Sequence, residues 1–159
     1  MSVRPASAKS GKKYFETFYV GAEGTQYFIK PLSLDSDESG EELLVDVTFR
    51  YKDEVRDSAI VNFSVIGREI YKAIESLRIM NDGVSISDTH PELIFNERKN
   101  DEFVSRFATK LPLGKVKELF ENDEWQFQLY TDKGTITFEP TGKASKAINV
   151  LNEKVFVIM

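Results

Sequence analysis

The chain has 159 residues, of which 41% are hydrophobic and 30% are charged, and this composition predicts a packed core rather than global disorder. The length suits one compact domain or two small fused halves. Cysteine is absent, which excludes disulfides, thiolate metal sites and cysteine nucleophiles and agrees with a reducing compartment, so we expect a cytoplasmic protein. No run of about 18 apolar residues is present, so the sequence predicts no membrane span.

The formal net charge of −5 is unevenly distributed. Residues 1–13 carry a charge of +4 with no acidic residue, which leaves −9 for residues 14–159. A short tail rich in Ser, Ala and Lys is predicted to be disordered. It could serve as an electrostatic arm for phosphates or an acidic partner, or it could be a solvated leader without a role.

The first half of the chain, residues 14–80, predicts four strands followed by a helix. "KYFETFYV" and "TQYFIKPL" are aromatic, β-prone runs joined by "GAEG", a pattern typical of a hairpin, and the acidic "PLSLDSDESGEE" predicts an exposed loop. "LLVDVTFRYKD" and "SAIVNFSVI" then alternate apolar and polar side chains, as half-buried strands do. Their expected inward residues are Val45, Val47, Phe49 and Tyr51, then Ala59, Val61, Phe63 and Val65. After Gly67, apolar residues recur at helical spacing at Ile70, Ala73, Ile74 and Leu77.

The segment "NDGVSISDTHPE" is rich in turn residues and predicts the boundary between two halves. The second half, residues 81–159, predicts the same order of elements with one short helix inserted at "LGKVKELFEND". "EWQFQLYT" alternates as a strand, "DKG" predicts a turn, and Thr141 is a candidate N-cap. The last helix carries an apolar stripe at Ala144, Ala147, Ile148 and Leu151.

Two similar phrases lie at the strand-to-helix junction of each half, "VNFSVIGREIYKAIESL" and "ITFEPTGKASKAINVL". Both contain a Phe, a Gly, a basic residue, Lys-Ala-Ile and a Leu, which generic hairpin–helix packing or an internal duplication would explain. With the agreement in element order, duplication predicts an α+β fold of two ββββα units related by a pseudo-twofold. Its antiparallel sheets would have helices packed on one face, with Phe63 and Phe138 buried and Gly67 and Gly142 at the corners.

On these two phrases, the chain resembles the Whirly single-stranded-DNA-binding proteins and, more loosely, the Pur-alpha repeat proteins. The resemblance implies a duplicated ββββα fold and non-enzymatic binding of single-stranded nucleic acid. The sequence departs from Whirly proteins in one respect. Their basic Lys-Gly-Lys-Ala motif on the second strand is replaced here by "TQYFIKPL", which contains only Lys30.

No combination of residues in the sequence indicates catalysis or a cofactor. The single histidine, His90, lies beside Asp88 and Glu92, where it could be a metal or acid–base fragment, but neither further ligands nor a nucleophile are indicated, so a surface-loop histidine is favoured. The acidic cluster in residues 35–42 lacks the order of an EF-hand loop. We therefore expect no enzyme, no metal and no cofactor.

The outward faces of the predicted strands carry the candidate binding residues. Four cations would hold phosphates, while Tyr130 and the N-terminal aromatics would stack on bases and further polar residues would complete the surface. The candidates are Arg50, Lys52, Arg106, Lys110, Tyr130, Gln126, Gln128 and Lys30. The alternative is a protein-binding module (an inhibitor, immunity or assembly factor) that uses an acidic surface or a sheet edge. Unpaired edges also predict a homo-oligomer.

Overall fold

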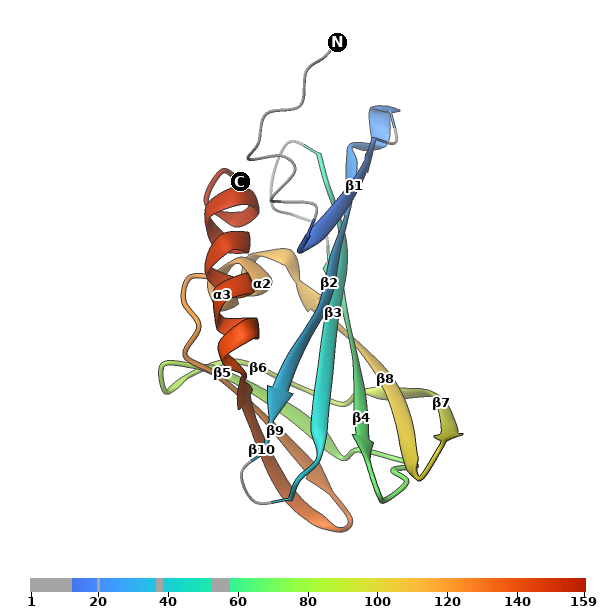
Figure 1. Cartoon of the computed structure of the whole chain (residues 1–159). Coiled ribbons are helices and arrows are strands. Elements are labelled where there is room, and N and C mark those ends of the chain that lie inside the picture. Colours follow the sequence, from blue (N-terminus) through green and yellow to red (C-terminus); the bar gives the residue numbers. More distant parts are fainter. Residues whose placement is uncertain (1–12, 20, 37–38, 53–57) are drawn as a thin grey trace.

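The computed structural model describes residues 13–19, 21–36, 39–52 and 58–159, so the predicted N-terminal tail lies outside it except for Lys13. The strands form one antiparallel sheet that curls into a half-barrel, in the order β6-β5-β9-β10-β2-β3-β4-β8-β7, with β1 added to β2 (Figure 1). The strands are β1 (Phe15–Tyr19), β2 (Thr25–Asp35), β3 (Glu42–Tyr51), β4 (Ser58–Gly67), β5 (Ser76–Asn81), β6 (Val84–Thr89), β7 (Glu92–Lys99), β8 (Glu102–Pro112), β9 (Trp125–Thr131) and β10 (Gly134–Pro140). The helices are η1 (Gly21–Glu23), α2 (Leu113–Leu119), α3 (Gly142–Leu151) and η2, a π-helical turn (Asn152–Phe156).

The strands predicted from alternation are confirmed at β3, β4 and β9. Every second side chain is buried in each, because one face of the sheet turns toward the core and the other toward solvent. The buried sets are Val45, Val47 and Phe49; Ala59, Val61, Phe63 and Val65; and Trp125, Phe127 and Leu129.

The C-terminal helix is also confirmed, together with its cap. The Thr141 side chain accepts a hydrogen bond from the Ala144 backbone N–H at 3.2 Å, and the predicted apolar stripe is buried. η2 continues α3 and carries Phe156, whose ring centroid lies 4.4 Å from that of Phe120 and 5.6 Å from that of Phe49. The end of the chain thus joins the core face of the sheet to α2 (Figure 1).

The prediction of an α+β fold of two ββββα units with helices packed on one sheet face is wrong. The chain is mostly antiparallel sheet curled into a half-barrel, and the first of the two predicted helices does not form. Residues 68–75 are irregular and residues 76–81 form β5, in which Leu77, Ile79 and Asn81 are buried alternately. Backbone groups that a helix would pair internally have other partners here. The Tyr71 N–H donates to Ser105 Oγ at 3.1 Å, and Lys133 Nζ donates to the Ile70 carbonyl at 2.8 Å.

The predicted boundary between the halves is instead a hairpin within the sheet. Asp82 and Gly83 have φ angles of 52° and 78°, as a two-residue type I′ turn requires, and they join β5 to β6. Strands of the two predicted halves interleave, since β5 pairs with β9 and β4 pairs with β8. Phe63 and Phe138 are buried as predicted, but Gly67 ends a strand whereas Gly142 begins a helix.

Candidate nucleic-acid interface

The predicted phosphate-binding cations lie on the outer face of the sheet, but they are not equivalent. Arg50 and Lys110 are exposed on β3 and β8, and Lys52 is exposed just after β3. Arg106 is only partly exposed, binds both carboxylate oxygens of Asp46 at 3.0 Å and donates to Ser64 Oγ at 3.1 Å. Because this ion pair already balances the charge of Arg106, it offers little attraction to a phosphate.

The predicted polar residues of β9 lie elsewhere, because β10 and β2 separate β9 from β3 in the sheet. Their side chains bind one another and their neighbours. The Tyr130 hydroxyl donates to Gln128 at 3.1 Å, and Gln126 donates to Glu139 at 3.2 Å. The guanidinium of Arg78 lies 5.6 Å from the centroid of the Tyr130 ring, so that ring already has a cation beside it. The structure therefore does not gather the predicted residues into one surface.

Lys30 lies at a gap in the sheet. On one side β2 pairs with β1 as far as Ile29, and the Lys30 N–H donates to the Tyr14 carbonyl at 2.9 Å. On that same side β2 next pairs with β10, beginning at Leu34. Within the described parts of the chain no strand fills the interval, and the beginning of α3 lies beside it: the Ser33 and Thr141 hydroxyls are 2.9 Å apart.

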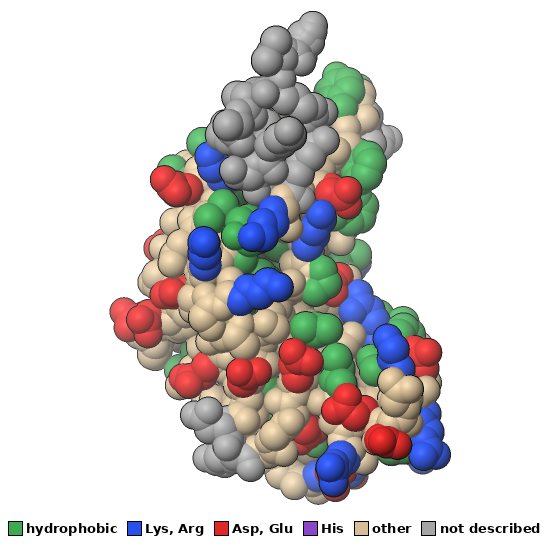
Figure 2. Space-filling view, in the orientation of Figure 1, with side chains coloured by type: hydrophobic (Ala, Val, Ile, Leu, Met, Phe, Trp, Pro, Cys, Tyr) green, Lys and Arg blue, Asp and Glu red, His purple; other side chains and the backbone are tan. Residues whose placement is uncertain are grey.

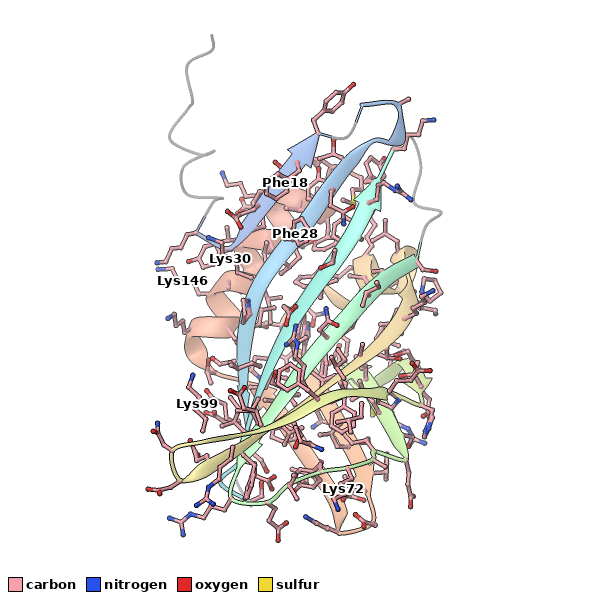
Figure 3. The ribbon with its side chains drawn as sticks, turned by 90° about the vertical axis from the view of Figure 1, so that its right-hand side faces the viewer. Phe18, Phe28, Lys30, Lys72, Lys99 and Lys146 are labelled. Atoms are coloured by element: carbon pink, nitrogen blue, oxygen red, sulfur yellow. The ribbon has the colours of Figure 1, made fainter. Side chains whose placement is uncertain are left out.

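A hollow of about 450 Å³ occupies this gap. Three lysines and a single acid are among its lining residues, and we call it the lysine hollow. Its charged lining residues are Lys13, Lys30, Lys143 and Glu42, and the remaining ones are largely apolar, including Leu32, Leu44, Ala144 and Ala147. Figure 2 shows basic side chains gathered on this side of the molecule, and Figure 3 shows Lys146, three residues beyond Lys143 on α3, near Lys30.

Two exposed aromatic rings lie next to this hollow on β1 and β2. Phe18 is 53% exposed and Phe28 is 38% exposed, and their rings meet edge to face with centroids 5.5 Å apart (Figure 3). Phe28 precedes Lys30 by two residues, so both alternate to the outer side of β2. We refer to Phe18 and Phe28 as the outer ring pair. Together with the lysine hollow, it forms the candidate interface.

Two of the predicted cations lie in or beside the cross-strand row that contains Phe28 of the outer ring pair. Across β2, β3, β4 and β8, the pairing places Phe28, Thr48, Ile60 and Lys110 in one row. Three strand spacings span about 14 Å, so Lys110 is within the reach of a chain of a few nucleotides that starts at Phe28. Arg50 lies opposite Gln26, beside this row. Arg50 and Lys110 thus flank the candidate interface on the side away from α3.

Sequence reasoning predicted that N-terminal aromatics would be exposed, and the structure shows which ones are. It did not identify Lys143 or Lys146, although a signal was present. Both lie on the polar side of the predicted apolar stripe of α3, three residues apart and therefore on one helix face.

The described residues include no group of histidine, cysteine or acidic side chains arranged to hold a metal ion. His90 is placed by a hydrogen bond between its Nδ1 and the Glu75 carbonyl, 2.7 Å away. In the described parts of the chain, no helix has both the length and the apolar character needed to cross a membrane. Comparisons with known protein families, with curated proteins and with solved structures found no match to this chain.

Proposed function

We propose that the protein binds single-stranded nucleic acid at the candidate interface and catalyses no reaction. The observation that carries this proposal is the exposed outer ring pair beside the lysine hollow. Proteins that bind single strands without strong sequence preference combine aromatic rings, on which any base can stack, with cations that follow the backbone. The proposal rests on this surface and not on the duplicated fold that the Whirly resemblance implies.

The two parts of the interface would have different roles. A base would stack on the exposed face of Phe18 or Phe28, as described for aromatic platforms. The phosphate beside that base would enter the lysine hollow, which Lys143 lines, and Lys146 would add charge from the same face of α3. This local excess of positive charge offsets the repulsion that a chain with a net charge of −5 exerts on phosphates.

The test is a fluorescence-anisotropy titration of a short labelled oligonucleotide with the full chain at several salt concentrations. We expect Phe18→Ala and Phe28→Ala each to cost about 1–3 kcal/mol of binding free energy without changing the salt dependence, since stacking releases few counterions. Lys143→Gln and Lys146→Gln should instead each lower the slope of log affinity against log salt by about 0.7 per lost phosphate contact.

One exposed lysine serves as a matched control. Lys72 lies away from the outer ring pair, toward the opposite end of the molecule (Figure 3). Lys72→Gln removes the same charge and should leave both affinity and slope unchanged. Equal losses in the control and in the α3 lysine variants would show that net charge alone governs binding. If neither DNA nor RNA binds at low salt, the proposal is wrong and a protein partner becomes the better explanation for the exposed rings.

A further inference from the structure

The second surface that folding leaves unexplained is the edge strand β7. β7 ends the sheet and pairs with β8 on one side, and among the described residues no strand pairs with its other side. Three consecutive apolar side chains are exposed there: Leu93 at 40%, Ile94 at 51% and Phe95 at 40%. An exposed apolar edge is a template for a further strand, and natural proteins usually cover or disrupt it.

The three side chains do not share one face of the sheet. Leu93 lies opposite the buried Phe107, whereas Phe95 lies opposite Arg106, whose guanidinium binds Asp46 on the outer face. Ile94 falls at the bulge between them. A partner that packs on one face of the sheet would cover only part of this set. A partner that adds a strand to the edge contacts side chains on both faces and pairs with the free backbone groups.

The distribution of charge along β7 indicates which strand fits this edge. The strand begins with Glu92 and ends with Arg98 and Lys99, so its first half carries −1 and its second half, which includes Glu97, carries +1. In antiparallel pairing of two identical strands, the acidic start of each meets the basic end of the other, and opposite charges across a strand pair stabilise it. Two other strands, β6 and β1, also have an edge that no described strand pairs with; β6 has Asp88, β1 has Glu16 and neither has a basic residue, so both lack this complementarity.

The bulge does not prevent such pairing. It is confined to residues 93–95, and from Phe95 to Lys99 the register with β8 is regular. Pairing that sets Glu92 opposite Arg98 of a second copy places the two-fold axis at Phe95. The Phe95 side chains of the two copies would then meet at the middle of the interface, with Ile94 opposite Asn96, Leu93 opposite Glu97 and the charged pairs at the ends.

We propose that the protein forms a two-fold homodimer by antiparallel pairing of β7 with β7 of a second copy. The proposal is independent of nucleic-acid binding, because β7 carries none of the residues of the candidate interface. One strand pair is a small interface, at the lower end of those that hold proteins together specifically (below about 1,200 Å²). Dimer formation is therefore expected to depend on protein concentration.

Sedimentation equilibrium of the full chain tests this proposal, with a monomer of 18.2 kDa and a dimer of twice that mass as the two species. Glu92→Lys makes both ends of the strand basic, and the double variant Arg98→Glu/Lys99→Glu makes both ends acidic. Each should weaken self-association at least about tenfold, since like charges placed opposite each other repel. Lys72→Glu is a matched control for charge reversal at an exposed residue away from β7 and should leave dimerisation unchanged.

Mixing the two charge variants gives the decisive measurement. A β7 with two basic ends and a β7 with two acidic ends repel their own copies and attract each other, so the mixture should form a heterodimer at concentrations where neither variant dimerises alone. Because these side chains are at the surface, both variants should stay folded, which circular dichroism can verify. A wild-type protein that is monomeric at all micromolar concentrations, a mixture that fails to associate, or variants that still dimerise normally would each overturn the proposal.

Discussion

Tyr27 and Phe28 are neighbours on β2, yet their rings have opposite surroundings. Tyr27 turns toward the core, where its ring centroid lies 6.3 Å from that of Phe15 and 4.9 Å from that of Phe49. Phe28 turns outward, is 38% exposed and meets the edge of Phe18. Because side chains alternate along a strand, the Tyr27 ring packs toward the core and the Phe28 ring lies at the surface.

The inner ring belongs to a continuous series of aromatic contacts. From Tyr27 the series continues through Phe49, Phe156, Phe120 and Trp125, with neighbouring centroids 4.4 to 5.6 Å apart. It links β2, β3, η2, the C-cap of α2 and β9, so these rings are part of the packed core. Folding gives no such reason for the outer ring pair. Apolar area that stays exposed where the core does not need it is a sign of a binding surface.

The largest effect is expected where the inner series is interrupted. Phe49 is 2% exposed and lies between the stacked ring of Tyr27 and the tilted ring of Phe156, so Phe49→Ala leaves a cavity between these two rings. We expect it to lower the free energy of unfolding by about 3–5 kcal/mol. Urea denaturation followed by tryptophan fluorescence measures this. A loss below about 1 kcal/mol would mean that the inner rings do not hold the sheet to the C-terminal segment.

The second prediction concerns the packing around Gly67, a position without a side chain. A Cβ added at Gly67 would lie 2.6 Å from Cγ of Glu41, so Gly67→Ala overpacks the end of β4 and should cost about 1–3 kcal/mol of unfolding free energy. Gly114 in α2 is the matched control, because a Cβ there meets no atom within 4 Å. Gly114→Ala should be neutral or stabilise by up to about 1 kcal/mol. Equal effects at both glycines would contradict this packing argument.

Tyr71 is an aromatic residue whose hydroxyl is buried together with its ring, and the pH dependence of stability measures the free-energy cost of ionising that hydroxyl. Burial, then hydrogen bonding and proximity to Glu41, raise the pKa of Tyr71 above its ordinary value of 10.0. Above about pH 10 the unfolded chain loses this proton while the folded chain keeps it, so stability falls as pH rises, by at most about 1.4 kcal/mol per pH unit. Below pH 10 the tyrosine contributes no pH dependence.

Tyr71→Phe should remove this part of the alkaline decline, although lysine deprotonation will still contribute to the remainder. Unfolding free energies of both proteins measured from pH 8 to pH 11 give the comparison. Parallel curves across that range would mean that Tyr71 ionises as readily in the folded protein as in the unfolded one.

Local patterns in the sequence predicted the strands whose two faces differ most clearly. Val45, Val47 and Phe49 alternate with polar residues, and the structure buries that set. The failure at residues 68–81 has a physical reason. Ile74 and Leu77 fit a helical stripe, whereas Leu77 and Ile79 fit a strand equally well, and pairing with β9 decides between the two. Such pairing joins residues about fifty positions apart in the chain, and the local spacing of apolar residues carries no information about it.

The candidate interface was predictable only in part for a similar reason. The aromatic residues of "FETFY" and "TQYFIK" occupy both faces of their strands, so the sequence indicates rings at the surface without saying which. The lysine hollow depends on the interval in β2 between β1 and β10 and on where α3 begins. Lys30 was a candidate from the sequence, but Lys143 joins it only through the fold.

The smallest expected effect on stability is at the outer ring pair. Its size decides whether the outer rings, unlike the inner aromatic series, are free of a structural role. Phe18→Ala and Phe28→Ala remove rings that are 53% and 38% exposed, so the loss of burial should cost each variant less than about 1 kcal/mol of unfolding free energy. The loss of the edge-to-face contact between the two rings should add about 0.5–1.5 kcal/mol. A double-mutant cycle in urea isolates that contact. If these variants instead unfold as readily as Phe49→Ala, the outer rings are part of the structural core and their exposure no longer points to a ligand. If the variants are as stable as expected and lose nucleic-acid affinity, then one face of β2 packs in the core and the other face binds nucleic acid.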